Sequence, residues 1–248
     1  MPVRVRPEAP FINNSMKLFT NGCSFTWGAE IWSEELNFIG IPEKVPYNLN
    51  QFREEKVYSG ILHQKLNTSE LHNLSYGGAS NQRIVRTTLE FFINHINKGL
   101  PVDDFLAVIQ WTRPERFEVY DTASGCYVSM LPNCSVPGLP PDRFKFLQNR
   151  FFENPINYLD NFNISCVTLS SFFDLHKIKY VFCTIDVHTT PSEGYYKQNI
   201  KWLGDSPKLN ALSELVTNHT YPQLHPNLDG HRIIAEKLYI RLKELYNL

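Results

Sequence analysis

The sequence lacks the features that mark membrane and nucleic-acid-binding proteins. It contains no stretch of about 18 apolar residues, so we expect no helix that crosses a membrane. It contains no run of lysine and arginine, and its formal net charge is −1, so we expect no nucleic-acid or membrane-surface partner. The N-terminal segment MPVRVRPEAPFINNS has basic residues but no apolar centre, unlike a signal peptide. Together these absences predict a cytoplasmic protein.

Metal-binding and disulfide patterns are absent as well. The chain has 5 cysteines, an odd number, and none of them is part of a CxxC pair. This spacing argues against a zinc or dithiol site and for a reduced, intracellular protein. His188, His225 and His231, together with Asp186, show no HxxxH-like spacing. We therefore expect neither a metal nor a cofactor.

The chain does have the composition of a globular protein. Hydrophobic residues make up 42% and charged residues 20% of its 248 residues, which is enough to bury a sizeable core. We expect residues 1–15 to form a loose N-terminal arm and residues 16–248 to form a single domain. Within this domain, a hairpin-like pattern followed by several prolines predicts an irregular excursion at about 118–150.

Short apolar segments alternate with helical patterns along the chain. We expect strands at 16–21, 71–75, 105–110 and 180–185, helices at 57–66, 80–98, 154–176 and 228–246, a short helix near 207–216 and a loop at 40–52. Strands that are apolar throughout indicate a parallel sheet with both faces covered. The predicted fold class is therefore α/β: a three-layer α/β/α sandwich with a mostly parallel, flavodoxin-like central sheet.

Polar residues gather directly after the predicted strands. The four strands are followed by Asn21-Gly22-Cys23-Ser24, by Tyr76-Gly77-Gly78-Ala79-Ser80-Asn81, by Trp111-Thr112-Arg113 and by Asp186-Val187-His188, and His225 precedes the last helix. Ligand sites of parallel α/β sheets lie beyond the carboxyl ends of the strands, so we expect the functional site among these residues.

Ser24 and His225 are the candidates for nucleophilic catalysis. A serine hydroxyl is a poor nucleophile until a base takes its proton, so Ser24 needs a histidine within hydrogen-bond reach. His225 is the best choice because a loop at a strand end can carry it over Ser24. The backbone amides of Ser24 and Gly78 could face a developing oxyanion, with the Asn81 side chain as a further donor.

Three segments together resemble the sequence blocks of the SGNH (GDSL-like) hydrolase family. NGCSFTWG resembles its first block, NLSYGGASN its second, and HPNLDGHRIIAE its last, in the family's order between residues 16 and 247. The resemblance implies that Ser24 is the nucleophile and that His225 is the general base. It also implies that a glycine of the second block, Gly78 in preference to Gly77, supplies an oxyanion-hole amide.

The acid of the family's triad is missing from its usual place. The family has an aspartate three residues before the catalytic histidine, where this chain has Pro222, and Gln223 follows. His225 would then be oriented by Asp186, by Asp205, by a backbone carbonyl or by nothing. Loss of the orienting aspartate from a Ser-His-Asp triad can cost on the order of ten-thousandfold in turnover.

The third block of the family is altered too. Its Gly-x-Asn-Asp is replaced by Trp111-Thr112-Arg113-Pro114, so the usual asparagine donor is missing. Gln110, Thr112 or Arg113 would take its place. Arg113 is also near enough to the strand end to touch an anionic or sugar substrate, although it is most simply part of a solvated or ion-paired patch.

Each candidate has a structural interpretation beside the catalytic one. Ser24 and Asn81 are both good helix-capping residues. Cys23 points away from the nucleophile if Ser24 is catalytic, and it is best interpreted as a small buried residue. His231, one turn into the last helix, is expected to pack near the start of that helix.

The predicted function is a serine-dependent ester hydrolase, an esterase or deacylase, that uses a Ser-His dyad or an incomplete triad. The resemblance implies a small-molecule or carbohydrate ester as substrate, with O-acetyl groups on a carbohydrate the commonest case. Two alternatives remain: a non-catalytic binding or structural module on the same fold, and an acyltransferase with the same serine and histidine. The excursion at 118–150 would form part of the cleft wall or a contact in a homo-oligomer.

Overall fold

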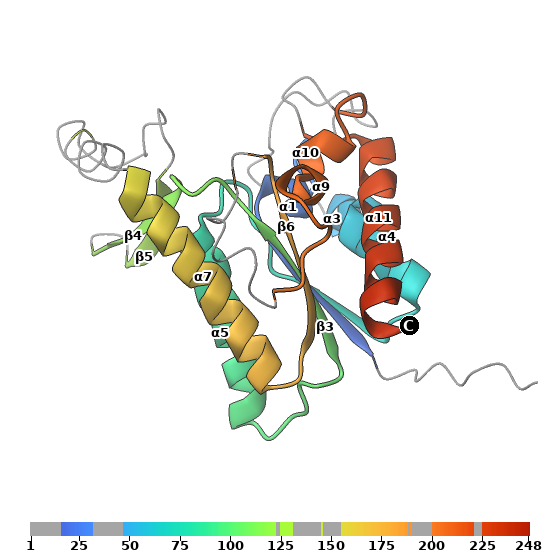
Figure 1. Ribbon diagram of the computed structural model, residues 1–248, viewed down its shortest axis with the longest axis horizontal. Helices are drawn as coiled ribbons and strands as arrows, with labels where there is room; N and C mark the ends of the chain where they lie inside the picture. Colours follow the sequence, from blue (N-terminus) through green and yellow to red (C-terminus); the bar gives the residue numbers. More distant parts are fainter. Residues whose placement is uncertain are drawn as a thin grey trace, which may run out of the picture.

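The central element of the molecule is a parallel sheet of four strands (Figure 1). The computed structural model describes residues 16–31, 47–122, 125–130, 145, 155–187, 189, 200–220 and 225–248. The sheet consists of β1 (Lys17–Asn21), β2 (Glu70–Asn73), β3 (Phe105–Trp111) and β6 (Lys179–Thr184), in the order β2-β1-β3-β6. All three pairings are parallel. The predicted flavodoxin-like order is confirmed, since the chain goes to one side of β1 and then to the other.

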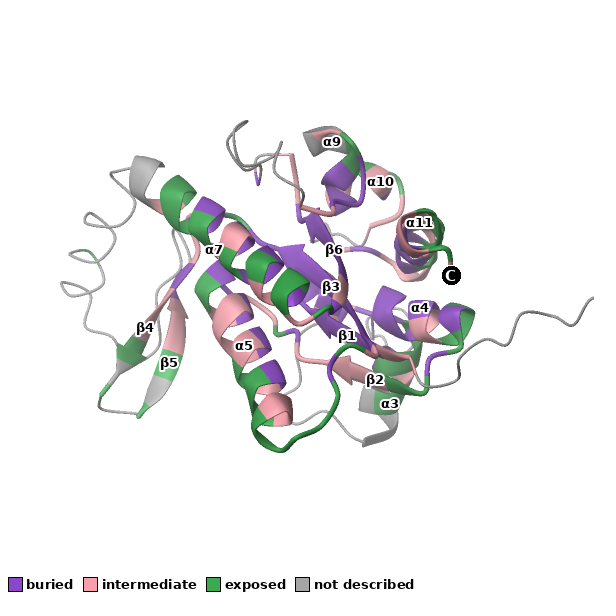
Figure 2. Ribbon diagram, turned by 60° about the horizontal axis from the view of Figure 1, so that its bottom comes forward, coloured by how far each residue is buried: buried purple, intermediate pink, exposed green. Residues whose placement is uncertain are grey.

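Helices cover both faces of this sheet (Figure 2). One layer contains α5 (Asn81–Asn97) and α7 (Pro155–Leu175), which pack against each other. The other contains α3 (Tyr47–Lys56), α4 (Tyr58–Leu66) and α11 (Leu228–Tyr246), with α4 against α3 and α11. The fold is therefore a three-layer α/β/α sandwich, as predicted.

Burial of β3 and β6 explains why these two strands are largely apolar, whereas β2, with the sequence ELHN, has no buried residue. Every residue of β3 is buried, and so is every residue of β6 except Lys179. In α5 the buried face is narrower than its apolar stripe: Ile84 and Phe92 are fully buried, whereas Ile93 is 43% exposed. Helix and strand positions follow the hydrophobic period closely because burial of apolar surface is the main favourable contribution to folding.

The loop predicted at 40–52 is wrong in its second half. Helix α3 begins at Tyr47, where the sequence YNLNQFREEK supplies glutamine, arginine and glutamate as helix formers despite its two asparagines. Residues 32–46, which hold the first part of the predicted loop, lie outside the described residues.

The predicted hairpin is present. Strands β4 (Phe117–Asp121) and β5 (Cys126–Met130) pair antiparallel in a separate two-stranded sheet. The short helical region near 207–216 consists of α9 (Pro207–Asn210) and α10 (Leu212–Leu215). The predicted arm at 1–15 and, apart from Lys145, residues 131–154 lie outside the described residues. Among the helices that are described, none is both long and apolar enough to cross a membrane.

The topological switch point of the sheet lies between β1 and β3, where successive strands are added on opposite sides of β1. Strand β1 pairs with β2 on one side and with β3 on the other, with Asn21 opposite Ile109. Loops that leave the carboxyl ends of β1 and β3 therefore diverge, and the space between them is where α/β sheets bind ligands. Ser24 and Thr112 follow these two strands.

Candidate active site

Ser24 begins a single helical turn directly after β1. Helix α1 (Ser24–Trp27) follows Cys23, and Ser24 is 8% exposed. Gly28 ends the turn in the left-handed conformation, with φ 78°, and its N–H donates to the Ser24 carbonyl at 2.9 Å. The N–H of Ala29 donates to the same carbonyl at 3.0 Å. The N–H groups of Gly28 and Ala29 thus fix the position of the Ser24 backbone carbonyl.

Gln110 of β3 holds the same turn from the neighbouring strand. Its Oε1 accepts from the Cys23 backbone N–H at 3.1 Å, from the Thr26 hydroxyl at 3.1 Å and from the Cys23 thiol at 3.3 Å. Its Nε2 donates to the Trp111 carbonyl at 2.7 Å. A Cβ at Gly22 would lie 2.3 Å from the Thr26 hydroxyl oxygen, so only glycine allows this close approach. Gln110 supports the turn that carries Ser24 through these contacts, and fully buried Cys23 belongs to the core.

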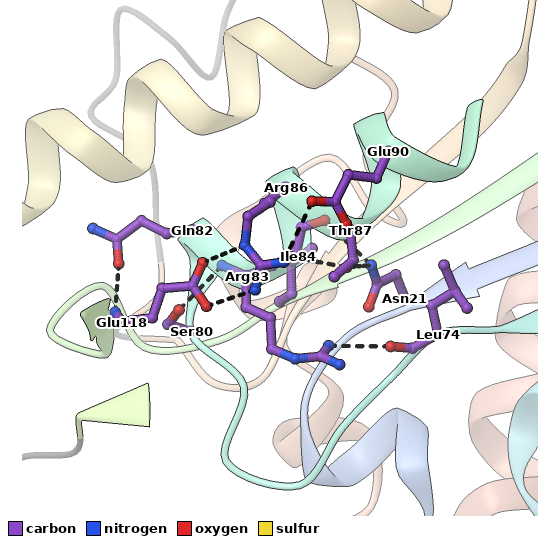
Figure 3. Close-up of polar contacts among 10 residues, drawn as sticks. All are labelled: Asn21, Leu74, Ser80, Gln82, Arg83, Ile84, Arg86, Thr87, Glu90 and Glu118. Atoms are coloured by element: carbon purple, nitrogen blue, oxygen red, sulfur yellow. Dashed lines mark hydrogen bonds and ion pairs between the residues drawn. The ribbon is translucent and has the colours of Figure 1, made fainter. Parts of the chain in front are cut away.

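The second strand-end loop is tied to the first. Asn21 accepts from the Gly22 N–H and donates to the Ile84 carbonyl and to the hydroxyls of Thr87 and Thr88, all on α5 (Figure 3 draws the contacts with Ile84 and Thr87). The Gly22 carbonyl accepts from the Tyr76 N–H at 3.2 Å. This last contact places the Tyr76-to-Ser80 loop beside the turn that carries Ser24.

Gly78 has a left-handed backbone conformation with open space beside it. Its φ is 76°, a conformation that favours glycine, and a Cβ built there would have no atom within 4 Å. A Cβ at Gly77 would instead lie 3.7 Å from the Trp27 ring. The open space is therefore at Gly78, whereas Gly77 packs beside the Trp27 ring.

Asn81 joins α5 to the end of β3. Its Nδ2 donates to the Thr112 carbonyl and its Oδ1 accepts from the Thr112 N–H, both at 2.9 Å. The helix cap is Ser80, whose hydroxyl accepts from the Arg83 N–H at 3.1 Å. Within the described part of the chain, the buried Thr112 hydroxyl has no hydrogen-bond partner. The structure brings Asn81 and Thr112 together, with the Asn81 carboxamide facing the protein backbone.

The two aspartates expected to orient His225 contact arginines. Asp186 accepts from Arg113 Nε at 2.8 Å, and its other oxygen accepts from the N–H and hydroxyl of Thr189 at 3.1 Å. The hydrogen bond that Arg113 donates to Asp186 raises the pKa of the Arg113 guanidinium. Asp205, at the surface, lies 3.2 Å from Arg241 Nη2. Arg113, whose side chain is 53% exposed, therefore lies at the rim of the strand ends in an ion pair.

His225 is hydrogen-bonded to a carboxylate that the sequence analysis did not identify. Its Nδ1 lies 2.8 Å from Glu30 Oε2. The ring also packs edge-on against Phe25, the neighbour of Ser24, with the ring centroids 5.8 Å apart. No local pattern could have indicated this contact because it joins residues 195 positions apart. Glu30 is marked only as a carboxylate six residues after a candidate nucleophile.

Among the described residues no hydrogen bond joins the Ser24 and His225 side chains, although Phe25, next to Ser24, contacts the His225 ring. Among the hydrogen bonds of the described residues, the Ser24 hydroxyl contacts Cys23 Sγ, at 3.8 Å, and not the His225 ring. Such bonds are often long before substrate binds. The loop of His225 is anchored on both sides, since Pro226 pairs with Thr220 and Asn227 caps α11 by accepting from the Gly230 N–H at 2.9 Å.

His231 is fully buried beneath this loop. Its Nδ1 accepts from the Tyr58 backbone N–H at 3.3 Å. Burial, with the neighbouring charge of His225 as a smaller cause, lowers the pKa of His231 to about 3. A neutral imidazole in this position joins the start of α4 to α11, in agreement with a structural role. His188 lies outside the described residues.

The sheet, the layers and the strand-end side chains define an α/β protein with a candidate active site at the carboxyl edge of its sheet. The chain belongs to a family described as "Family of unknown function (DUF6071)", whose model matches residues 42–194, more than half of the chain. The matched range includes Gly78, Asn81, Thr112 and Arg113. Ser24 and His225 lie outside it.

Comparison with curated protein sequences gives no match. Similar solved structures include a member of the lipolytic protein G-D-S-L family from Veillonella parvula, with 13% identity, a TM-score of 0.47, and coverage of 94% of this chain and 99% of that one. A GDSL-like lipase from Bacteroides thetaiotaomicron has 11% identity, a TM-score of 0.46, and coverage of 92% of this chain and 88% of that one. Similarities at this level do not assign a function, which has to be argued from the side chains of this chain.

Proposed function

We propose that this protein is a serine-dependent ester hydrolase of the SGNH type, with Ser24 as nucleophile and His225 as general base. The observation that carries the proposal is the position of His225. Its ring packs against Phe25, next to Ser24, and is hydrogen-bonded through Nδ1, so Nε2 remains as the atom that can take a proton. Ser24 follows β1 and His225 precedes α11, and in this proposal both belong to the edge of the sheet where α/β proteins bind ligands.

The reaction begins with attack of Ser24 Oγ on the ester carbonyl carbon. The Oγ proton moves to His225 Nε2 as the new C–O bond forms, and the same proton then passes to the leaving alcohol as the ester C–O bond breaks. Water next attacks the acyl-serine and gives a proton to Nε2. Collapse of this second intermediate releases the carboxylic acid and returns the proton to Ser24 Oγ.

The negative charge of the tetrahedral intermediate requires hydrogen-bond donors close to the nucleophile. The backbone amides of Ser24 and Gly78 are the proposed donors, supported by the open space at Gly78 and by the Tyr76–Gly22 contact. The Thr112 hydroxyl at the end of β3 is a further donor. In this proposal Asn81 acts indirectly, because its carboxamide positions the Thr112 backbone.

The proposed substrates are small acyl esters, including O-acetyl groups of carbohydrates. The wall of the site supports this choice: Trp27 lies beside Gly77, and Tyr76 next to it is 55% exposed with the Arg83 guanidinium 4.8 Å from its ring centre. Aromatic faces of this kind stack on sugar rings. Arg113 at the rim is placed to contact the polar part of the substrate.

A serine-directed fluorophosphonate probe tests the proposal directly. The purified protein should be labelled and should hydrolyse p-nitrophenyl acetate, and Ser24→Ala should lose both activities by at least about a thousandfold. Ser165→Ala on α7 is the matched control and should behave as the parent protein. A parent protein that neither reacts with the probe nor hydrolyses the ester would support a binding module instead. Labelling with slow hydrolysis that an added alcohol acceptor accelerates would identify an acyltransferase.

A further inference from the structure

We propose that Glu30 is the positioning residue for His225 and completes a Ser24–His225–Glu30 triad. The inference rests on the proposed function and adds the member that is missing from its usual place before the histidine. It assigns a role to a residue that lies just after the helical turn of Ser24.

The contact has the geometry of a carboxylate–imidazole pair. Glu30 Oε2 lies 2.8 Å from His225 Nδ1, and the two side chains are 17% and 20% exposed. An ionised carboxylate can only accept a hydrogen bond, so the ring has to donate from Nδ1. This selects the tautomer whose Nε2 carries the lone pair, which is the form that a general base for Ser24 requires.

The backbone around Glu30 keeps the carboxylate in place. Glu30 has φ 68°, an uncommon conformation for a residue other than glycine. Ile31, the next residue, is fully buried and clusters with Val57, and Leu228 at the start of α11 packs against the same cluster. Since Leu228 follows His225 by three residues, one apolar cluster anchors both partners of the hydrogen bond.

Glu30 also accounts for the proline at position 222, where the SGNH family has its aspartate. A proline there can supply no carboxylate, and Asp186 and Asp205 contact Arg113 and Arg241. The nucleophile and the acid are instead six residues apart on the segment from Ser24 to Ile31. The His225 loop then needs to supply only the base.

The role of Glu30 in the reaction is electrostatic and orientational. When the Ser24 proton reaches Nε2, the ring becomes an imidazolium that already donates to the Glu30 carboxylate. Glu30 stays ionised throughout, and the proton goes on to the leaving alcohol. Removing the carboxylate should therefore lower kcat while leaving KM nearly unchanged.

The test compares Glu30→Gln, Glu30→Gly and Glu30→Asp with Glu55→Gln, an exposed control on α3. Glutamine and glycine at position 30 should lower kcat for p-nitrophenyl acetate by on the order of 10³- to 10⁴-fold, and slow fluorophosphonate labelling similarly. Aspartate should restore part of the activity. Glu30→Gly removes the carboxylate but suits the left-handed backbone, so a variant that melts like the parent and remains inactive separates positioning from folding.

A second measurement does not depend on turnover. In nitrogen-15 NMR spectra at pH 8, His225 of the parent should be protonated at Nδ1, and Glu30→Gln should shift the balance toward the Nε2-protonated tautomer. Unchanged kcat and an unchanged tautomer in Glu30→Gln would overturn the triad while leaving Ser24 and His225 as a dyad. If the parent protein lacks activity and the His225 tautomer still changes in Glu30→Gln, the proposed function is contradicted and the positioning contact remains supported.

Discussion

At the scale of single residues, the candidate site depends on buried polar side chains that bind backbone groups and other buried side chains. Gln110 accepts three hydrogen bonds from Cys23 and Thr26, Asn81 binds both backbone groups of Thr112, and His231 accepts from the Tyr58 N–H. Each is nearly or fully buried. A buried polar group costs free energy unless it is paired, so such contacts select one arrangement of the loops.

His231 makes stability depend on pH. Burial lowers its pKa from 6.5 to about 3, so between these values the unfolded chain binds a proton that the folded protein excludes. Stability therefore rises with pH across this window and is lost as pH falls below about 6.5. The asparagine oxygen of His231→Asn can still accept from the Tyr58 N–H but does not titrate. The free energy of unfolding of this variant should therefore fall less steeply with decreasing pH than that of the parent, by up to about 1.4 kcal/mol per pH unit.

Urea unfolding of the parent and His231→Asn at several pH values between 7 and 4.5 measures this slope. The comparison uses the difference between the two curves, which removes contributions from carboxylates common to both proteins. Parallel curves would show that His231 does not titrate in the expected window.

At the scale of elements, the β4–β5 hairpin is attached to α5 through Arg86 and Gln82. Arg86 Nε and Nη2 donate to the two oxygens of Glu118 at 2.9 and 3.0 Å, and the Glu118 backbone N–H donates to Gln82 (Figure 3). The Arg86 guanidinium also lies 4.1 Å from the centre of the Tyr127 ring. These contacts hold an outlying hairpin against the helix that begins beside Gly78.

Arg86→Ala should loosen the hairpin more than the rest of the molecule. Glu118 is 6% exposed at its side chain, so removal of its partner leaves a buried carboxylate and should cost about 1–3 kcal/mol. Hydrogen exchange should become faster across Phe117–Met130, while β1 and β3 stay protected. Glu90→Gln is the control, because Glu90 is 59% exposed and 3.5 Å from Arg86, and it should change stability by less than about 0.5 kcal/mol. Equal exchange rates in Arg86→Ala and the parent would contradict the attachment.

At the scale of the whole molecule, the C-terminal helix covers the outer edge of the sheet and follows His225, the proposed base. The Tyr246 hydroxyl donates to the Tyr180 carbonyl and accepts from the Tyr180 N–H, both at 2.7 Å. Farther along β6, Phe182 bonds to Lys201 and Leu203 through its backbone. The outer edge of β6 is thus covered over these residues, as an edge strand requires to avoid pairing with another chain. The same helix α11 follows directly after His225.

Tyr246→Phe should destabilise the whole domain. It leaves both backbone groups of Tyr180 without their hydroxyl partner, so we expect the free energy of unfolding to fall by about 1–3 kcal/mol. Tyr239→Phe on the same helix keeps the ring that Lys65 and Lys243 face, and it serves as the control. Chemical denaturation followed by circular dichroism measures both variants. A loss no larger for Tyr246→Phe than for Tyr239→Phe would contradict the edge-covering role.

Local periodicity was sufficient to predict most of the fold. Apolar runs at 105–110 and 180–185 correspond to β3 and β6, and the 3.6-residue stripe at 228–246 corresponds to α11. The helix that begins at Tyr47 was missed because its helix formers follow a stretch rich in proline and asparagine. The spacing of apolar residues predicts burial well, since it indicates which side of a helix or strand faces the core.

Most of the elements, their order and the polar residues beside them, including Ser24, Gly78 and His225, could be predicted from the residue pattern. How the side chains pair depended on the folded chain. Asp186 turned out to contact Arg113, Asn81 to contact Thr112, and Glu30 to contact His225. The physical reason is distance along the chain: hydrophobic periodicity is encoded locally, whereas a hydrogen bond between residues 30 and 225 depends on the paths of two loops over a finished sheet.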